Sequence, residues 1–88
     1  MASVLLYATK CDICEDFVPI VRRLRPQVHI IAHPSHESYR FILDNGFIEG
    51  YPVLIEDNIY YYGKRKILKH LGISKLRYNI ERLILWVI

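Results

Sequence analysis

Residues 3–14 read SVLLYATKCDIC, and this stretch decides how the rest of the chain is interpreted. Its first six residues form a nearly unbroken run of strand-forming, mostly apolar residues, which is typical of a β-strand covered on both faces. From Asp12 to Leu24 the apolar residues recur at steps of three and four, so this segment is predicted to be a helix with one buried face. Cys11 and Cys14 therefore stand where a strand passes into a helix, and open α/β sheets place their sites there.

The remaining sequence continues to alternate between strands and helices. Strands are expected over residues 28–32, 53–55 and 59–62, and helices before residues 45–46, over 64–71 and from Ser74 onward. The first two strands require a right-handed parallel crossover. Asp57 and Asn58 tolerate the positive backbone angles of a tight hairpin, so the last two strands should pair antiparallel. The sequence thus predicts one α/β domain over residues 1–88, with a mixed four-stranded sheet, helices on both faces and a helical C-terminal extension over residues 73–88.

Two of the predicted helices carry apolar stripes. A short stripe in the helix before Asn45 is formed by Tyr39, Ile42 and Leu43. A longer stripe in the C-terminal helix is formed by Leu76, Ile80, Leu83 and Val87. We expect the C-terminal helix to pack on the chain's own sheet, which gives a monomer; a dimer formed through this helix is the alternative.

Composition limits the class of protein. The chain has 88 residues, of which 52% are hydrophobic, and a formal net charge of +3. This is enough for one compact domain with a core. No segment approaches the roughly 20 apolar residues that cross a bilayer, and no cationic leader precedes an apolar run, so we expect no membrane partner and a cytoplasmic location. No aromatic residues are interleaved with the basic ones in the pattern of a nucleic-acid surface, so no nucleic-acid partner is expected.

The chain's two cysteines lie in a single C-x-x-C motif. They cannot link distant segments, and a disulfide between them closes too small a loop to stabilise the fold much, so redox chemistry or metal binding is the expected reason for the spacing. A cysteine at a helix N-terminus has its pKa lowered by unpaired N–H groups, with Lys10 acting in the same direction and Asp12 against it. Cys11 is therefore the predicted nucleophile, and Cys14, one helical turn later, the predicted resolving thiol.

Four features resemble the thioredoxin superfamily, whose small members are the glutaredoxins, over about residues 3–72. The cysteine pair joins the first strand to the first helix, and Pro19 lies inside that helix, five residues after Cys14. Residues 48–54, IEGYPVL, resemble the segment in which a cis-proline precedes the third strand. Gly63 matches the glycine that the family places between the hairpin and the next helix.

The resemblance implies a thioredoxin-like fold and the activity of a glutaredoxin- or thioredoxin-like protein disulfide reductase. It implies that Pro52 is cis and faces Cys11, with Tyr51 and Pro52 flanking the substrate sulfur. The substrate-binding residues predicted on this basis are Lys10, Tyr51, Pro52 and Gly63. The implied partners are disulfide-containing proteins and an electron donor, either glutathione or a thioredoxin-reductase-type enzyme. No bound cofactor and no metal are expected, and glutathione is a candidate reductant.

The chain departs from the family at several positions. Thioredoxins have Trp before the first cysteine and Gly-Pro between the pair, where this chain has Lys10 and Asp12-Ile13. Leu5 stands where thioredoxins have a buried Asp, so Glu15, Asp16 or water must assist Cys14 instead. These differences leave the redox potential and the choice of electron donor undetermined by the sequence.

Two alternative functions use the same residues differently. Cys11 and Cys14 together with His33 and His36 supply four side chains of the types that bind zinc tetrahedrally. The second alternative is a non-catalytic thioredoxin-fold module that only docks a partner.

Overall fold

The computed structural model describes residues 3–46 and 48–87, without the side chains of Asp12 and Ile13. The predicted influence of Asp12 on Cys11 therefore lies outside the described residues. The elements follow one another as β1 (Val4–Ala8), α1 (Asp12–Leu24), β2 (His29–His33), α2 (His36–Asn45), β3 (Val53–Glu56), β4 (Ile59–Tyr62), α3 (Lys64–His70) and α4 (Lys75–Val87). The predicted order of strands and helices is confirmed.

The four strands form one mixed sheet in the order β2-β1-β3-β4. β1 pairs in parallel with β2, and β3 pairs antiparallel with both β1 and β4. Asp57 and Asn58 adopt φ angles of 54° and 64°, so they turn the β3–β4 hairpin as predicted. This sheet brings the end of β1, the end of β2 and the start of β3 to one edge, because Leu6 pairs with both Ile31 and Val53.

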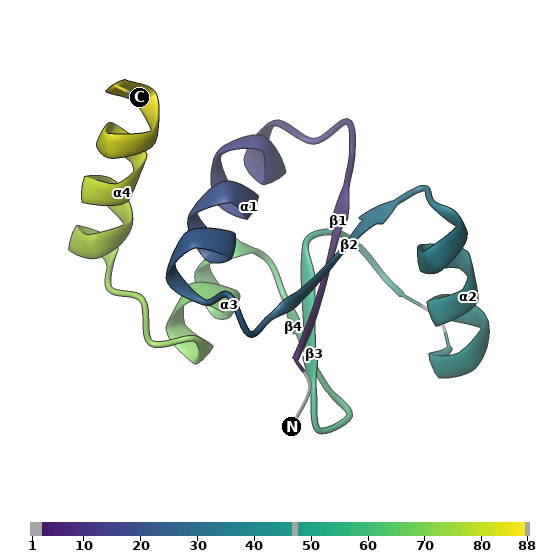
Figure 1. Ribbon diagram of the computed structural model, residues 1–88. Coiled ribbons are helices and arrows are strands. Elements are labelled where there is room, and N and C mark those ends of the chain that lie inside the picture. Colours follow the sequence, from purple (N-terminus) through teal and green to yellow (C-terminus); the bar gives the residue numbers. More distant parts are fainter. Residues whose placement is uncertain (1–2, 47, 88) are drawn as a thin grey trace.

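Helices cover both faces of the sheet, and each face has its own core (Figure 1). Figure 1 shows α2 on one face and α1 with α3 on the other, while α4 lies outside α1. Successive side chains of β1 point to opposite faces of the sheet, so Leu5 packs in the core under α1 and Leu6 in the core under α2. Both side chains are fully buried, as the apolar run of β1 predicts.

The first helix buries the face that its periodicity predicts. Phe17, Ile20 and Val21 are fully buried against the sheet, and Pro19 lies inside the helix on its exposed side. Arg22 and Arg23 occupy the last turn, where positive charge suits the negative end of the helix dipole.

Of the apolar stripe expected in α2, Ile42 is half-buried, but Tyr39 and Leu43 lie on the surface. Their side chains are 57% and 85% exposed, whereas Ser38 is fully buried. Ser38 closes a capping box with Ser35, in which each backbone N–H donates to the other residue's hydroxyl oxygen. This cap fixes the start of the helix so that the face bearing Ser38 and Phe41 meets the sheet.

The prediction for the C-terminal helix is also corrected. α4 begins after a Ser74 cap, whose Oγ accepts the Arg77 N–H at 3.1 Å, but it packs against α1 and not against the sheet. The reason is steric, since α1 and α3 already cover that face of the sheet. The predicted apolar stripe faces outward, and Tyr78 and Glu81 are buried in its place.

A buried carboxylate fixes this orientation of α4. Glu81 Oε2 lies 2.9 Å from Arg23 Nε of α1, and its Oε1 lies 3.3 Å from Arg77 Nε of the same helix. Because a carboxylate is costly to bury without cationic partners, the helix docks with Glu81 toward Arg23. Among the described residues, no helix combines the length and the hydropathy that crossing a membrane requires.

Candidate active site

Both cysteines occupy the first turn of α1. Cys11 is the N-cap, with an extended backbone, and Cys14 is the third residue of the helix. The Cys14 N–H points at Cys11 Sγ, with N and Sγ 3.4 Å apart. Cys11 is half-buried, whereas Cys14 is only 2% exposed. The spacing thus gives one half-buried cysteine, whose sulfur accepts an N–H of the first helical turn, and one buried cysteine in the same turn.

The thiol of Cys14 has a high pKa. Burial is the largest cause, and a hydrogen bond with the Cys11 side chain adds to it. The charge of Cys11 acts in the same direction, and a backbone hydrogen bond with Ala8 opposes them. Together these raise the pKa of Cys14 from 9.0 to about 11. Cys14 is consequently a neutral thiol at physiological pH.

This pKa predicts that the two cysteines are alkylated in different pH ranges. A pKa of about 11 in place of 9.0 lowers the thiolate fraction of Cys14 about 100-fold at any pH below 9. Iodoacetamide should therefore modify Cys11 first and reach Cys14 only as the pH approaches 11 or when the chain unfolds. Peptide mass spectrometry on samples alkylated at a series of pH values measures this. Equal modification of both residues in the folded protein at neutral pH would contradict it.

The start of β3 brings two predicted substrate-binding residues together. The Tyr51–Pro52 peptide bond is cis, as the resemblance implies, and Pro52 is buried. The Gly63 N–H donates to the Pro52 carbonyl oxygen at 3.0 Å. Gly63 has a φ of 90°, which side-chain-bearing residues rarely adopt, so the glycine is needed for this junction. Both residues lie at the sheet edge where β1 leads into Cys11, because Val53 pairs with Leu6.

His33 also lies at this end of the sheet, where it was expected only as a candidate zinc ligand. His33 ends β2, pairs with Ala8, and its carbonyl oxygen accepts the Thr9 N–H at 2.9 Å. Its ring stacks on that of Tyr51 with centroids 4.9 Å apart and planes 11° apart. On its other side, Nδ1 lies 2.9 Å from Ser38 Oγ.

His33 therefore ties the turn before Cys11 to the residue before the cis-proline. Tyr51 is half-buried under this ring, and burial, followed by the nearby Tyr39, raises its pKa. The available sequence signal was the position of His33 at the end of the strand next to the cysteine-bearing one. A second X-Pro bond in cis, His33–Pro34, follows at the same place.

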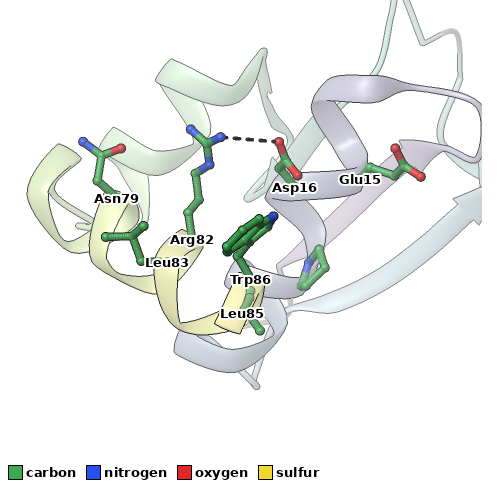
Figure 2. A pocket seen from close by; sticks show the side chains of 8 residues that line it. Glu15, Asp16, Asn79, Arg82, Leu83, Leu85 and Trp86 are labelled. Carbon is green, nitrogen blue, oxygen red and sulfur yellow. Dashed lines mark ion pairs between the residues drawn. The ribbon is translucent and has the colours of Figure 1, made fainter. Parts of the chain in front are cut away.

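The remaining predicted residues lie on the surface around α1. Lys10 is exposed in the turn before Cys11. Glu15 and Asp16 are exposed on the side of α1 that faces α4, and Asp16 Oδ2 lies 3.9 Å from Arg82 of α4. These two carboxylates form part of a pocket of about 650 Å³ between α1 and α4, and Figure 2 shows the Asp16–Arg82 pair bridging the helices at its wall.

The four side chains of the zinc alternative are not gathered at one point. The His33 ring is held by Tyr51 and Ser38, and His36 is exposed at the first residue of α2. Among the described side chains, no group of three or more His, Cys, Asp or Glu residues is placed to hold a metal ion. The geometry of this edge therefore gives no ligand set around Cys11 and Cys14.

Comparisons of the chain with protein-family models, with curated proteins and with solved structures find no match. The structure by itself establishes an α/β architecture with a mixed four-stranded sheet and four helices among the described residues. The chemistry of the cysteine pair and its surroundings is the basis on which a function is assigned.

Proposed function

We propose that this protein is a thiol-disulfide oxidoreductase of the thioredoxin-like type, which reduces disulfides in other proteins through Cys11 and Cys14. One observation carries the proposal: the Cys14 N–H lies against Cys11 Sγ at the start of α1, with the Cys14 thiol buried behind it. Helix N–H groups stabilise a thiolate, and the thiolate is the attacking species in disulfide exchange. In this proposal Cys11 is the nucleophile, and Cys14 is the resolving thiol that reacts in the second exchange.

The reaction proceeds in two exchanges. The Cys11 thiolate attacks one sulfur of a substrate disulfide, forming a mixed disulfide and releasing the other substrate sulfur as a thiolate. Cys14, once deprotonated, attacks Cys11 Sγ, and the bond between Cys11 and the substrate breaks. The substrate gains two electrons and two protons, and the protein is left with a Cys11–Cys14 disulfide. A dithiol donor, or two molecules of a thiol such as glutathione, must then return the two electrons.

The high pKa of Cys14 supports this order of steps. Besides burial, two of its causes come from Cys11: the hydrogen bond between the side chains and the charge of the Cys11 sulfur. When Cys11 is bonded to the substrate it carries no charge, so the charge no longer holds a proton on Cys14. Cys14 is therefore kept inactive before the first exchange and becomes easier to deprotonate after it.

The edge of the sheet next to Cys11 favours an extended protein segment as substrate. β3 is paired on both sides from Val53 onward, but Tyr51 precedes this pairing, so an extended segment can pair with the backbone around Tyr51 as an added strand. His33 holds the Tyr51 ring in place, so the side of this strand site is preformed. Exposed Lys10 adds a positive charge in the turn before Cys11. The Gly63 N–H donates a hydrogen bond to the Pro52 carbonyl oxygen and so holds the residue after Tyr51 in place. A reducing compartment such as the cytoplasm suits this activity.

A redox titration tests the proposal. The purified protein is equilibrated in a series of glutathione buffers, and the Cys11–Cys14 disulfide is quantified by mass spectrometry. We expect a reversible two-electron couple, with a potential near −270 mV for a thioredoxin-like reductant or about −200 to −230 mV for a glutaredoxin-like one. A protein that forms no reversible disulfide, or whose thiols react only after a chelator is added, is not an oxidoreductase of this type.

A further inference from the structure

The outer face of α4 carries an apolar stripe with a coiled-coil spacing. Its members and their exposed fractions are Leu76 (71%), Ile80 (44%), Leu83 (66%) and Val87 (77%). The steps between them are four, three and four residues, which matches alternating d and a positions of a heptad repeat. β-Branched residues, Ile80 and Val87, occupy the a positions, and leucines occupy the d positions. This distribution favours two parallel strands over higher oligomers.

The rest of the molecule lies on the opposite side of α4. Tyr78 and Glu81 are buried toward α1, and Leu85 packs against the same core. In the heptad these three residues take the f, b and f positions, which face away from a coiled-coil seam. Figure 1 shows the same arrangement, with α4 at the margin of the molecule and α1 between it and the sheet. A second helix can therefore reach Leu76, Ile80 and Val87 from outside the α/β body, while Leu83 also borders the pocket between α1 and α4.

We propose that a second copy of this chain covers the stripe, so that two α4 helices lie side by side in parallel around a two-fold axis. Each a or d residue then meets its own counterpart, Ile80 with Ile80 and Leu83 with Leu83, as an isologous interface requires. This inference does not depend on the proposed function, because the stripe lies on the outer face of α4 and Cys11 and Cys14 lie at the start of α1.

The charges beside the stripe permit this pairing. The e and g positions hold Arg77, Asn79, Ile84 and Trp86. Arg77 is the only charged residue among them, and its Nε is 3.3 Å from Glu81 of its own helix. Two copies can thus approach without placing uncompensated like charges opposite each other. Like charges at the e and g positions disfavour the association of two helices in a coiled coil.

The stripe leaves apolar surface exposed that a dimer would cover. Trp86 is 87% exposed but lies beside the stripe, where it lines the pocket between α1 and α4 (Figure 2). The four stripe residues themselves are between 44% and 77% exposed, so most of their apolar side-chain surface is uncovered. Four side chains supply less than the roughly 800 Å² per partner that a standard interface buries. Because the seam has only two heptads, the dimer should be in equilibrium with the monomer.

Sedimentation of the purified full chain over a range of concentrations tests the proposal. The wild type should show a concentration-dependent dimer, and Leu83→Glu should be monomeric, because it places two carboxylates opposite each other in the seam. The matched control is Leu43→Glu, a leucine that is 85% exposed on α2, which should dimerise like the wild type. A wild type that stays monomeric up to about 1 mM overturns the proposal and leaves the stripe to a partner of another kind.

A mixing experiment tests the parallel register. Leu83→Glu and Leu83→Lys should each be monomeric alone, with unchanged circular dichroism, and should form a heterodimer when mixed, because residue 83 meets residue 83 only in the parallel pair. Failure of the mixture to associate, while the wild type dimerises, overturns the parallel seam.

Discussion

Replacing Cys11 with serine is expected to reduce disulfide exchange to the uncatalysed background, whereas replacing Cys14 with serine is expected to stop the reaction after one attack. A serine hydroxyl is not ionised near neutral pH and does not attack disulfides, so the first variant loses the only step that engages the substrate. In the second variant the mixed disulfide between Cys11 and the substrate has no resolving thiol. Each Cys14→Ser chain should therefore hold one substrate molecule covalently.

The local structure around Cys11 allows a loss of activity to be separated from a loss of stability. Cys11 is the N-cap of α1, and its sulfur accepts the Cys14 N–H. Serine is among the best N-cap residues, so Cys11→Ser keeps the cap and should leave thermal unfolding close to that of the wild type. A loss of activity in a chain of unchanged stability then reports on chemistry alone. Turnover of a disulfide-containing protein, followed with mass spectrometry of the adduct, measures both effects.

Other outcomes would contradict the assignment of roles. If Cys11→Ser kept multiple turnover, the half-buried sulfur would not be the nucleophile. If Cys14→Ser formed no adduct with any disulfide, including oxidised glutathione, the proposed exchange chemistry would fail as a whole. If the adduct formed on Cys14 of Cys11→Ser, the two roles would be reversed.

The parts of the fold that sequence patterns predicted are those governed by local rules. The apolar run containing Leu5 and Leu6 predicted a strand buried on both faces, and the positive φ angles of Asp57 and Asn58 turn the hairpin where those residue types suggest. Phe17 and its neighbours at helical spacing predicted the buried face of α1. In each case the residue's own conformational preference or its period decides the outcome.

The predictions were wrong for helices whose apolar face could pack against more than one surface. Periodicity shows that α4 has an apolar face, but it does not show which surface covers that face. The ion pair between Glu81 and Arg23 at 2.9 Å contributes to turning the stripe outward, and these residues are 58 positions apart in the sequence. In α2 the hydroxyl of Ser38 similarly outweighs the apolar side chains of Tyr39 and Leu43, because it satisfies backbone groups at the helix start.

The candidate site was predictable to the same degree. The cysteine pair, the cis bond before Pro52 and the glycine at position 63 were identified from short segments. The contribution of His33 was not, because it depends on the register that places Ala8 beside His33 and on the stacking of its ring on Tyr51. These contacts join β1, β2 and the segment before β3, and no local pattern in any one of them carries that information.

Replacing Phe17 with alanine is expected to have the largest effect on stability. Phe17 is fully buried in the core between α1 and the sheet, among Leu5, Ile20 and Leu54. Phenylalanine-to-alanine substitutions at such sites cost about 3–5 kcal/mol, because the lost contacts leave a cavity that the neighbours fill only in part. A domain of this size has a total stability of about 5–15 kcal/mol, so the variant should lie near the limit of folding.

Thermal and urea unfolding measure this effect. At about 4–8 °C per kcal/mol for a small domain, the melting temperature should fall by at least about 12 °C. The matched control is Leu43→Ala, which removes an 85% exposed side chain and should change stability by less than about 0.5 kcal/mol. Because α1 carries both cysteines, Phe17→Ala should also expose Cys14 to alkylation at neutral pH, in proportion to the fraction of unfolded chains. A Phe17→Ala protein as stable as Leu43→Ala would show that α1 does not pack on the sheet through this residue, and the sheltered position of Cys14 would then need another explanation.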